Sequence, residues 1–96
     1  MPLLFEWEGN KAALNFKKHK VSFEEAKTVF QDPLGAVFFD ESHSFEEDRE
    51  IIVGYSRQNR LLFVGFTERR PDVVRIISAR KATKPERTAH EENQSK

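Results

Sequence analysis

The sequence has no cysteine, only four glycines, and no apolar run that approaches the length of a membrane span. Without cysteine there is neither a disulfide framework nor a thiolate zinc site, so a reducing compartment is expected. There is also no glycine-rich loop of the kind that cradles nucleotide phosphates. A membrane helix needs about 20 consecutive apolar residues, and the first residues lack the basic start and apolar core of a signal peptide. These absences predict a cytoplasmic protein without a membrane partner or a cofactor.

Nine phenylalanines among 96 residues indicate a packed core rather than a disordered chain. A chain of this length buries somewhat over ~60% of its unfolded surface and folds without disulfides. We therefore predict one domain over residues 1–92. The sequence from His90 onward lacks apolar periodicity, and we expect residues 93–96 to form a frayed tail.

The net charge of zero conceals two oppositely charged segments. Residues 40–50 contain six acidic residues and one arginine, whereas residues 57–87 contain nine Lys or Arg and three acidic residues. Such an asymmetry allows one surface to bind an anion and another surface to bind a cationic partner.

The N-terminal third predicts a short strand and two helices. We expect the strand over residues 3–7 and the first helix over residues 11–19, with Asn10 as its cap. The apolar residues of that helix are Ala12, Ala13 and Phe16.

The second helix has stronger terminal signals. Ser22 and Glu25 form a capping-box sequence, and Asp32 before Pro33 ends the helix because a residue before proline is pushed out of the α region. The apolar stripe of this helix is formed by Phe23, Ala26 and Phe30.

The remainder predicts four strands and a final helix. The strands are expected over 34–39, 51–55, 61–67 and from Val73 onward, separated by a polar loop over 40–48 and by turns over 56–59 and 69–72. Thr83 and Glu86 form a second capping box before a short C-terminal helix. The expected fold is therefore α+β, with a small central antiparallel sheet and two N-terminal helices packed on one of its faces.

The last predicted strand carries an unusual number of cations. The polar residues at or beside its end are Arg75, Ser78, Arg80, Lys81, Lys84 and Arg87. By strand alternation Ser78 and Arg80 share one face, and Arg75 points to the other face unless a bulge intervenes. Strand ends commonly present functional groups, although a solvated basic fringe is an equally good interpretation of this segment alone.

Phosphodiester cleavage in RNA is the chemistry that best fits these residues. The three histidines are far apart with no paired spacing, so a metal site is not expected. RNA can be cleaved without metal when a base deprotonates the 2′-OH, cations stabilise the phosphate charge and an acid protonates the leaving oxygen. Arg75 and Arg80 are the candidate phosphate clamps. The candidate proton carriers are His19 and Glu47, and the candidate positioning hydroxyls are Thr67 and Ser78. Each of these residues also has an ordinary structural explanation.

The chain resembles the BrnT family of small bacterial ribonuclease toxins. The matching runs are 5–8, Asn15, 18–19, 21–26, 29–30, 32–33, 47–49, 67–69, 75–82 and 86–87. The resemblance implies a RelE-like fold and a metal-independent endoribonuclease that inhibits translation. It also implies a cognate BrnA-like antitoxin that neutralises the toxin in a hetero-oligomer and binds operator DNA, which the toxin reaches only through that partner. Within the matching runs, Lys18, Arg49 and Lys81 become further candidates for RNA binding.

Two positions depart from the family's usual sequence. The family commonly has glycine where this chain has Lys20, which predicts a left-handed helix end there. It often has a tyrosine in the final helix where the nearest equivalent is His90. The alternative function is a protein without catalysis, an interaction module whose basic face binds an acidic partner.

Overall fold

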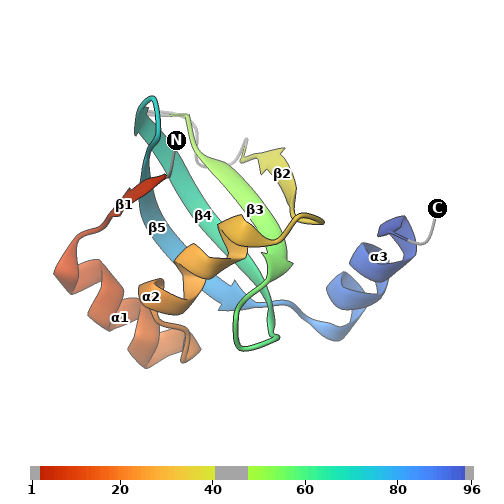
Figure 1. Ribbon diagram of the computed structural model, residues 1–96. Coiled ribbons are helices and arrows are strands. Elements are labelled where there is room, and N and C mark those ends of the chain that lie inside the picture. Colours follow the sequence, from red (N-terminus) through yellow and green to blue (C-terminus); the bar gives the residue numbers. More distant parts are fainter. Residues whose placement is uncertain (1–2, 41–47, 95–96) are drawn as a thin grey trace.

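The computed structural model describes residues 3–40 and 48–94 as one five-stranded sheet with flanking helices (Figure 1). The strands are β1 (Leu4–Glu6), β2 (Ala36–Phe39), β3 (Glu50–Tyr55), β4 (Leu61–Arg70) and β5 (Val73–Lys81), in the spatial order β1-β5-β4-β3-β2. The helices are α1 (Gly9–His19), α2 (Phe23–Ala26), the 3₁₀ helix η1 (Lys27–Gln31) and α3 (Lys84–Gln94). Within the described ranges, none of these helices has the length and apolarity needed to cross a membrane.

The sheet is mixed, which corrects the predicted antiparallel sheet. Strands β3 to β5 form the expected antiparallel meander and β2 pairs antiparallel with β3, but β1 pairs with β5 in parallel, with Leu4 opposite Val73 and Glu6 opposite Arg75. The two short connections, β3–β4 and β4–β5, could be inferred from nearby turn residues. The position of β1 depends instead on contacts with a strand about 70 residues away, which local sequence signals do not report.

One side of the sheet, which we call the core face, is covered by α2 and η1 (Figure 1). The buried residues of this cluster are Val21, Phe23, Ala26, Val29, Ile52, Leu62, Val64, Phe66, Val74, Ile76 and Ala79. Phe30 joins the two layers, because its ring makes edge contacts with Phe5 at 5.2 Å and with Phe66 at 5.0 Å between centroids. Phe5, Phe23, Phe30 and Phe66 thus belong to the core or pack against it, whereas Phe16, Phe38 and Phe39 are exposed.

Helix α1 differs from its prediction in both its start and its buried side. It begins at Gly9, so that Asn10 lies inside the first turn rather than at the cap. Phe16 is 49% exposed, and Asn15 is the residue that is buried. The side of α1 that faces the sheet thus contains Ala12, Asn15 and His19, spaced at i, i+3 and i+7.

Asn15 is buried because its amide takes the place of a neighbouring strand. Its side-chain nitrogen donates to the carbonyls of Ala79 (2.8 Å) and Val21 (3.0 Å), and its oxygen accepts from the Ala79 N–H at 3.1 Å. Strand β1 pairs with β5 only from Val73 to Arg75, so the free edge of β5 at Ala79 needs another partner. Asn15 supplies it and fixes α1 against β5.

Helix α2 begins at the predicted cap but is shorter than predicted. Ser22 accepts a hydrogen bond from the Glu25 N–H at 3.0 Å, and the chain tightens into η1 after Ala26. The Thr28 hydroxyl donates to the Glu25 carbonyl at 2.6 Å, which competes with a regular α-helical bond. Asp32 ends the segment as expected.

The carboxylate of Glu25 does not bond back to Ser22 as in a complete capping box but forms a buried ion pair with Arg60. It accepts hydrogen bonds from the Arg60 guanidinium and, at 2.7 Å, from the Ser56 hydroxyl. Hydrogen bonding by Arg60 holds the pKa of Glu25 below its usual value, although burial acts in the opposite direction. Arg60 also donates to the carbonyl of Lys20, which adopts the left-handed conformation (φ 60°) expected at the family's glycine position.

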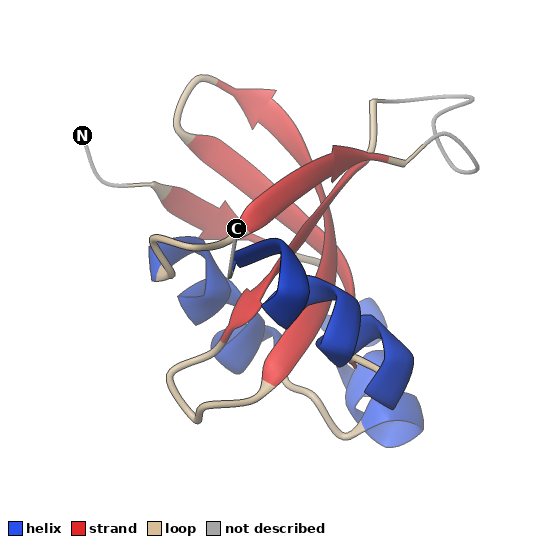
Figure 2. Ribbon diagram, turned by 90° about the vertical axis from the view of Figure 1, so that its right-hand side faces the viewer, coloured by secondary structure: helices blue, strands red, loops and turns tan. Residues whose placement is uncertain are grey.

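Helix α3 lies apart from α1 and α2, beyond the end of β5 (Figures 1 and 2). It begins with the predicted capping box, in which Thr83 N–H donates to Glu86 at 2.8 Å and Glu86 N–H donates to Thr83 at 3.3 Å. It continues to Gln94, past the point where fraying was expected. The C-terminal half of α3 contacts Tyr55 of β3. The Tyr55 and His90 ring centroids are 6.2 Å apart, and the Tyr55 hydroxyl donates to the Glu91 carboxylate at 3.3 Å.

Replacing Asn15 should destabilise the fold substantially. Asn15→Ala removes three hydrogen bonds and leaves the Ala79 and Val21 backbone groups buried without partners, which should lower the free energy of unfolding by about 2–4 kcal/mol. Urea denaturation followed by circular dichroism measures the change. Leu14→Ala is the matched control, because Leu14 is 66% exposed on the same helix and should cost less than about 0.5 kcal/mol. A loss below about 1 kcal/mol for Asn15→Ala would contradict this role.

Candidate functional site: an arginine pocket on the open sheet face

A β-bulge in β5 decides which side chains share a face. Gly65 is opposite Ser78, but the next residue of β4, Phe66, is opposite Ile76, so Ile77 is an extra residue. Val74, Ile76 and Ala79 consequently all reach the core face. Arg75, Ser78 and Arg80 are brought to the opposite side, the outer face. Because of this bulge, Arg75 lies on the same face of the sheet as Ser78 and Arg80.

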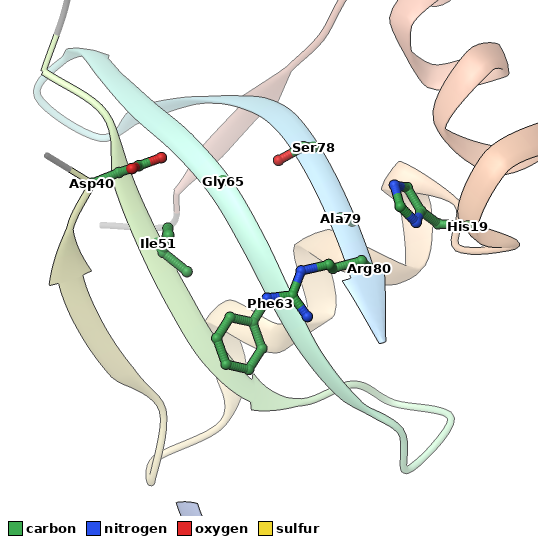
Figure 3. Close-up of a pocket in the computed structure, with 8 residues that line it drawn as sticks. All are labelled: His19, Asp40, Ile51, Phe63, Gly65, Ser78, Ala79 and Arg80. Carbon is green, nitrogen blue, oxygen red and sulfur yellow. The ribbon is translucent and has the colours of Figure 1, made fainter. Parts of the chain in front are cut away.

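The outer face holds a pocket of about 280 Å³ (Figure 3). Its lining residues are His19, Asp40, Ile51, Phe63, Gly65, Ser78, Ala79 and Arg80. They come from α1, from β3, β4 and β5, and from the residue that follows β2. Of the predicted site residues, the pocket thus contains His19, Ser78 and Arg80. His19 is about 60 positions away from the other two in the sequence.

Gly65 forms the floor of the pocket for a steric reason. A Cβ atom at this position would lie 2.6 Å from the Ser78 hydroxyl oxygen, a distance shorter than real Cβ contacts. Glycine therefore leaves room for the Ser78 hydroxyl between β4 and β5.

The guanidinium of Arg80 contacts Glu86 and the ring of Phe63. Its Nη1 and Nη2 atoms donate to the two carboxylate oxygens of Glu86 at 2.8 and 2.9 Å, and its central carbon lies 4.4 Å from the centroid of the Phe63 ring. The hydrogen bond with Glu86 raises the pKa of Arg80. Hydrogen bonding by Arg80, supported by the Thr83 N–H, lowers the pKa of Glu86 to about 2.

The other predicted site residues on β4 and β5 lie outside the pocket. Arg75 is roughly 15 Å along β5 from Arg80 and forms an ion pair with Glu6 at 3.7 Å. Thr67 is buried, and its hydroxyl donates to the carbonyl of Asp48 at 2.9 Å. Lys81 extends to the side of the core face, where it contributes less than Arg60 to the lowered pKa of Glu25.

A second hollow extends the pocket along α1. Its volume is about 270 Å³, and it shares His19 and Ser78 with the first. Lys18 and Lys11 contribute to its walls. The two hollows adjoin at His19 and Ser78, with Arg80 lining the first and Lys11 and Lys18 the second, and we refer to them together as the groove.

Three further residues considered from the sequence do not line the pocket within the described part of the chain. Arg49 lies beside the pocket wall, where its carbonyl accepts from the Asp40 N–H at 2.8 Å. Glu47 and most of the predicted polar loop lie outside the described residues. His90 lines a different hollow with Leu34 and Val53. Among the residues that the structure describes, no three or more His, Cys, Asp or Glu side chains converge as metal ligands would.

Six residues that line or support the pocket were not predicted as site residues, which are Asp40, Ile51, Phe63, Gly65, Ala79 and Glu86. Strand alternation contained part of the missing signal, because Phe63 and Gly65 alternate with the apolar core residues Leu62, Val64 and Phe66. Glu86 was identified only as a capping residue, and its second function depends on the position of α3 in space.

The fold and the site define a small α+β protein with an arginine-lined pocket on the open face of a mixed sheet. Residues 7–86 match the family model described as the ribonuclease toxin, BrnT, of type II toxin-antitoxin system. The chain therefore belongs to the BrnT family of ribonuclease toxins.

A solved structure has a similar fold. It is the crystal structure of the Brucella abortus ribonuclease toxin BrnT, which is 21% identical, with a TM-score of 0.66 over 88% of this chain and 99% of that chain. A comparison with curated proteins gives no match.

The Glu86–Arg80 pair should make stability depend on acidic pH. Because the pKa of Glu86 falls from 4.5 to about 2 on folding, its stabilising contribution is fully present above pH 4.5 and is lost as the pH falls towards 2. We expect Glu86→Gln to be less stable than the wild type at pH 7 and the difference to shrink progressively below pH 4.5. Thermal unfolding between pH 7 and 2.5 measures it. Glu92→Gln, an exposed change on the same helix, is the control, and a constant difference across this range would contradict the assignment.

Proposed function

We propose that this chain is the toxin of a toxin–antitoxin pair and acts as a metal-independent endoribonuclease in the cytoplasm. The observation that carries the proposal is the convergence of Arg80, His19 and Ser78 in one pocket on an open sheet face. The proposal includes inhibition of translation and a relationship to RelE-like ribonucleases.

In the proposed reaction, the 2′-oxygen of the RNA loses its proton to a base and attacks the adjacent phosphorus, the bond from phosphorus to the 5′-oxygen breaks, and an acid protonates that oxygen, which leaves a 2′,3′-cyclic phosphate and a 5′-hydroxyl. Arg80 stabilises the charge that develops on the phosphate oxygens, because a guanidinium donates paired hydrogen bonds in a fixed geometry. His19 transfers a proton to or from the reacting oxygens, and Ser78 positions the phosphate by its hydroxyl. Glu47 stays a candidate for the second proton transfer, and Asp40 is a carboxylate in the described pocket wall that can serve the same purpose.

The groove beside the pocket supports an extended substrate. Lys18 and Lys11 lie along it, where they can neutralise phosphates that flank the cleaved bond. Arg75, Arg49 and Lys81 lie outside this groove, and Thr67 is buried, so their predicted contacts with RNA would require a path beyond the pocket. A BrnA-like antitoxin that covers the pocket would neutralise the toxin, and the pair would reach operator DNA through the antitoxin.

Removing Arg80 should slow RNA cleavage strongly without unfolding the protein. We expect purified wild-type protein to cleave a long RNA in EDTA, leaving 2′,3′-cyclic phosphate ends, and Arg80→Ala to be about 10²–10³ times slower. Gel analysis and end-group chemistry measure both. Equal cleavage by the two proteins would place the site elsewhere.

Absence of cleavage by the wild type, with and without added ribosomes, would favour the alternative function. The same pocket would then serve only to bind an acidic segment of a partner. This alternative also predicts that Arg80→Ala weakens partner binding, so RNA cleavage is the measurement that separates the two functions.

A glycine pair in this chain offers a sharper test of the pocket itself. Gly65→Ala places a methyl group against the Ser78 hydroxyl, whereas a Cβ at Gly9 meets nothing within 4 Å. We expect Gly65→Ala to lower kcat/KM about tenfold or more by displacing Ser78. Gly9→Ala, the same chemical change in open space, should leave cleavage unchanged. Equal rates for both variants would show that Ser78 and the pocket floor do not contact the RNA.

A further inference from the structure

The hydrogen bonds of Arg80 leave one edge of its guanidinium available. An arginine has five N–H groups, and three of them are used here: Nη1 donates to Glu86 and to the Lys81 carbonyl at 3.3 Å, and Nη2 donates to Glu86. Within the described part of the chain, no acceptor contacts Nε or the second hydrogen of Nη2. These two groups lie on the same edge of the planar fork, which is the edge that forms paired hydrogen bonds with two phosphate oxygens.

The free edge points into the pocket. Figure 3 shows the guanidinium beside Phe63 with its Nε atom on the side of Ser78 and Gly65. The Phe63 ring, 4.4 Å from the guanidinium carbon, fixes the plane of the group. Glu86 fixes its rotation within that plane, since both of its oxygens are engaged.

We propose that Glu86 is a positioning residue for the cleavage reaction: it holds Arg80 by the two terminal nitrogens and turns the Nε–Nη2 edge towards the bound phosphate. This inference rests on the proposed ribonuclease function and deepens it, because it assigns a task to a residue of α3 that does not itself touch RNA. Orientation of this kind matters because a displacement of about 1 Å at a reacting centre can cost on the order of 10²-fold in rate.

The opposite effect, a latch in which Glu86 competes with phosphate for Arg80, fits the hydrogen bonds less well. A competing carboxylate would occupy the edge that the phosphate needs. Glu86 occupies the other edge, and it is itself held by the Thr83 N–H at 2.8 Å, which anchors it to the start of α3. The pair can therefore persist while a phosphate binds.

The test compares wild type, Glu86→Gln and the exposed control Glu92→Gln. Glutamine keeps the size of the side chain but replaces one acceptor oxygen with an NH₂ group, so it cannot accept both arginine hydrogen bonds. We expect Glu86→Gln to lower kcat for RNA cleavage about 10- to 100-fold, with KM changed less than about threefold. Glu92→Gln should match the wild type. Circular dichroism at the assay temperature confirms that both variants are folded.

A second measurement observes Arg80 directly and does not require cleavage. The ¹⁵N-detected or ¹H–¹⁵N signal of Arg80 Nε, assigned by its loss in Arg80→Lys, should shift when a 2′-O-methyl RNA is added to the wild type. The Nη signals, slowed by the Glu86 pair, should broaden or merge in Glu86→Gln. An unchanged Nη pattern in Glu86→Gln would overturn the proposal.

The kinetic outcomes separate this inference from the proposed function. Faster cleavage or tighter RNA binding by Glu86→Gln would show a latch and overturn positioning. Equal kcat in wild type and Glu86→Gln would overturn it while the ribonuclease function stands. If the wild type cleaves no RNA, the proposed function is wrong. Whether Glu86 orients Arg80 towards phosphate is then decided by the NMR signals: a shift of Nε on RNA addition and a changed Nη pattern in Glu86→Gln support it, and their absence contradicts it.

Discussion

The extra residue at Ile77 in β5 is the constraint on which the site depends. A regular strand from Val74 to Arg80 would place Val74, Ile76, Ser78 and Arg80 on one face, mixing the cations with the core. The bulge shifts the alternation by one position, so that Ala79 enters the core and Ser78 and Arg80 face outward. The apolar core and the polar pocket can therefore be built from the same nine-residue strand.

The second constraint is the attachment of α1 to that strand. Asn15 bonds to the backbone of Ala79, the residue between the pocket residues Ser78 and Arg80, and His19 lies one helical turn further along α1. A buried amide holds backbone groups in a defined register, which apolar packing alone does not do. His19 and Arg80, the proposed proton carrier and phosphate clamp, are thus aligned by one polar contact between distant segments of the chain.

The sequence predicted the features that depend on neighbouring residues. The Ser22 cap, the Thr83–Glu86 box and the antiparallel hairpins were correct because turn and cap chemistry acts over a few positions. The parallel pairing of β1 and the buried side of α1 were not predicted. Asparagine is normally exposed, and only the unpaired edge of β5 explains why Asn15 is buried. The shared face of Ser78 and Arg80 followed from alternation, but two adjacent isoleucines gave no signal that a bulge lies between them and Arg75.

Two arginine–glutamate pairs in this chain differ in geometry rather than in charge, one being structural and the other part of the proposed site. In the pair with Glu25, Arg60 donates through Nε and Nη2 to a carboxylate that is almost fully buried, and Nη2 also donates to the Lys20 carbonyl. Its phosphate-binding edge is already occupied, so the pair can only join α2 to the β3–β4 hairpin. Arg80 uses the opposite edge for Glu86 and is 41% exposed. Glu25 therefore occupies the Nε–Nη2 edge of Arg60, whereas Glu86 leaves the same edge of Arg80 available for an anion. The two pairs differ in which nitrogen atoms of the arginine donate to the carboxylate.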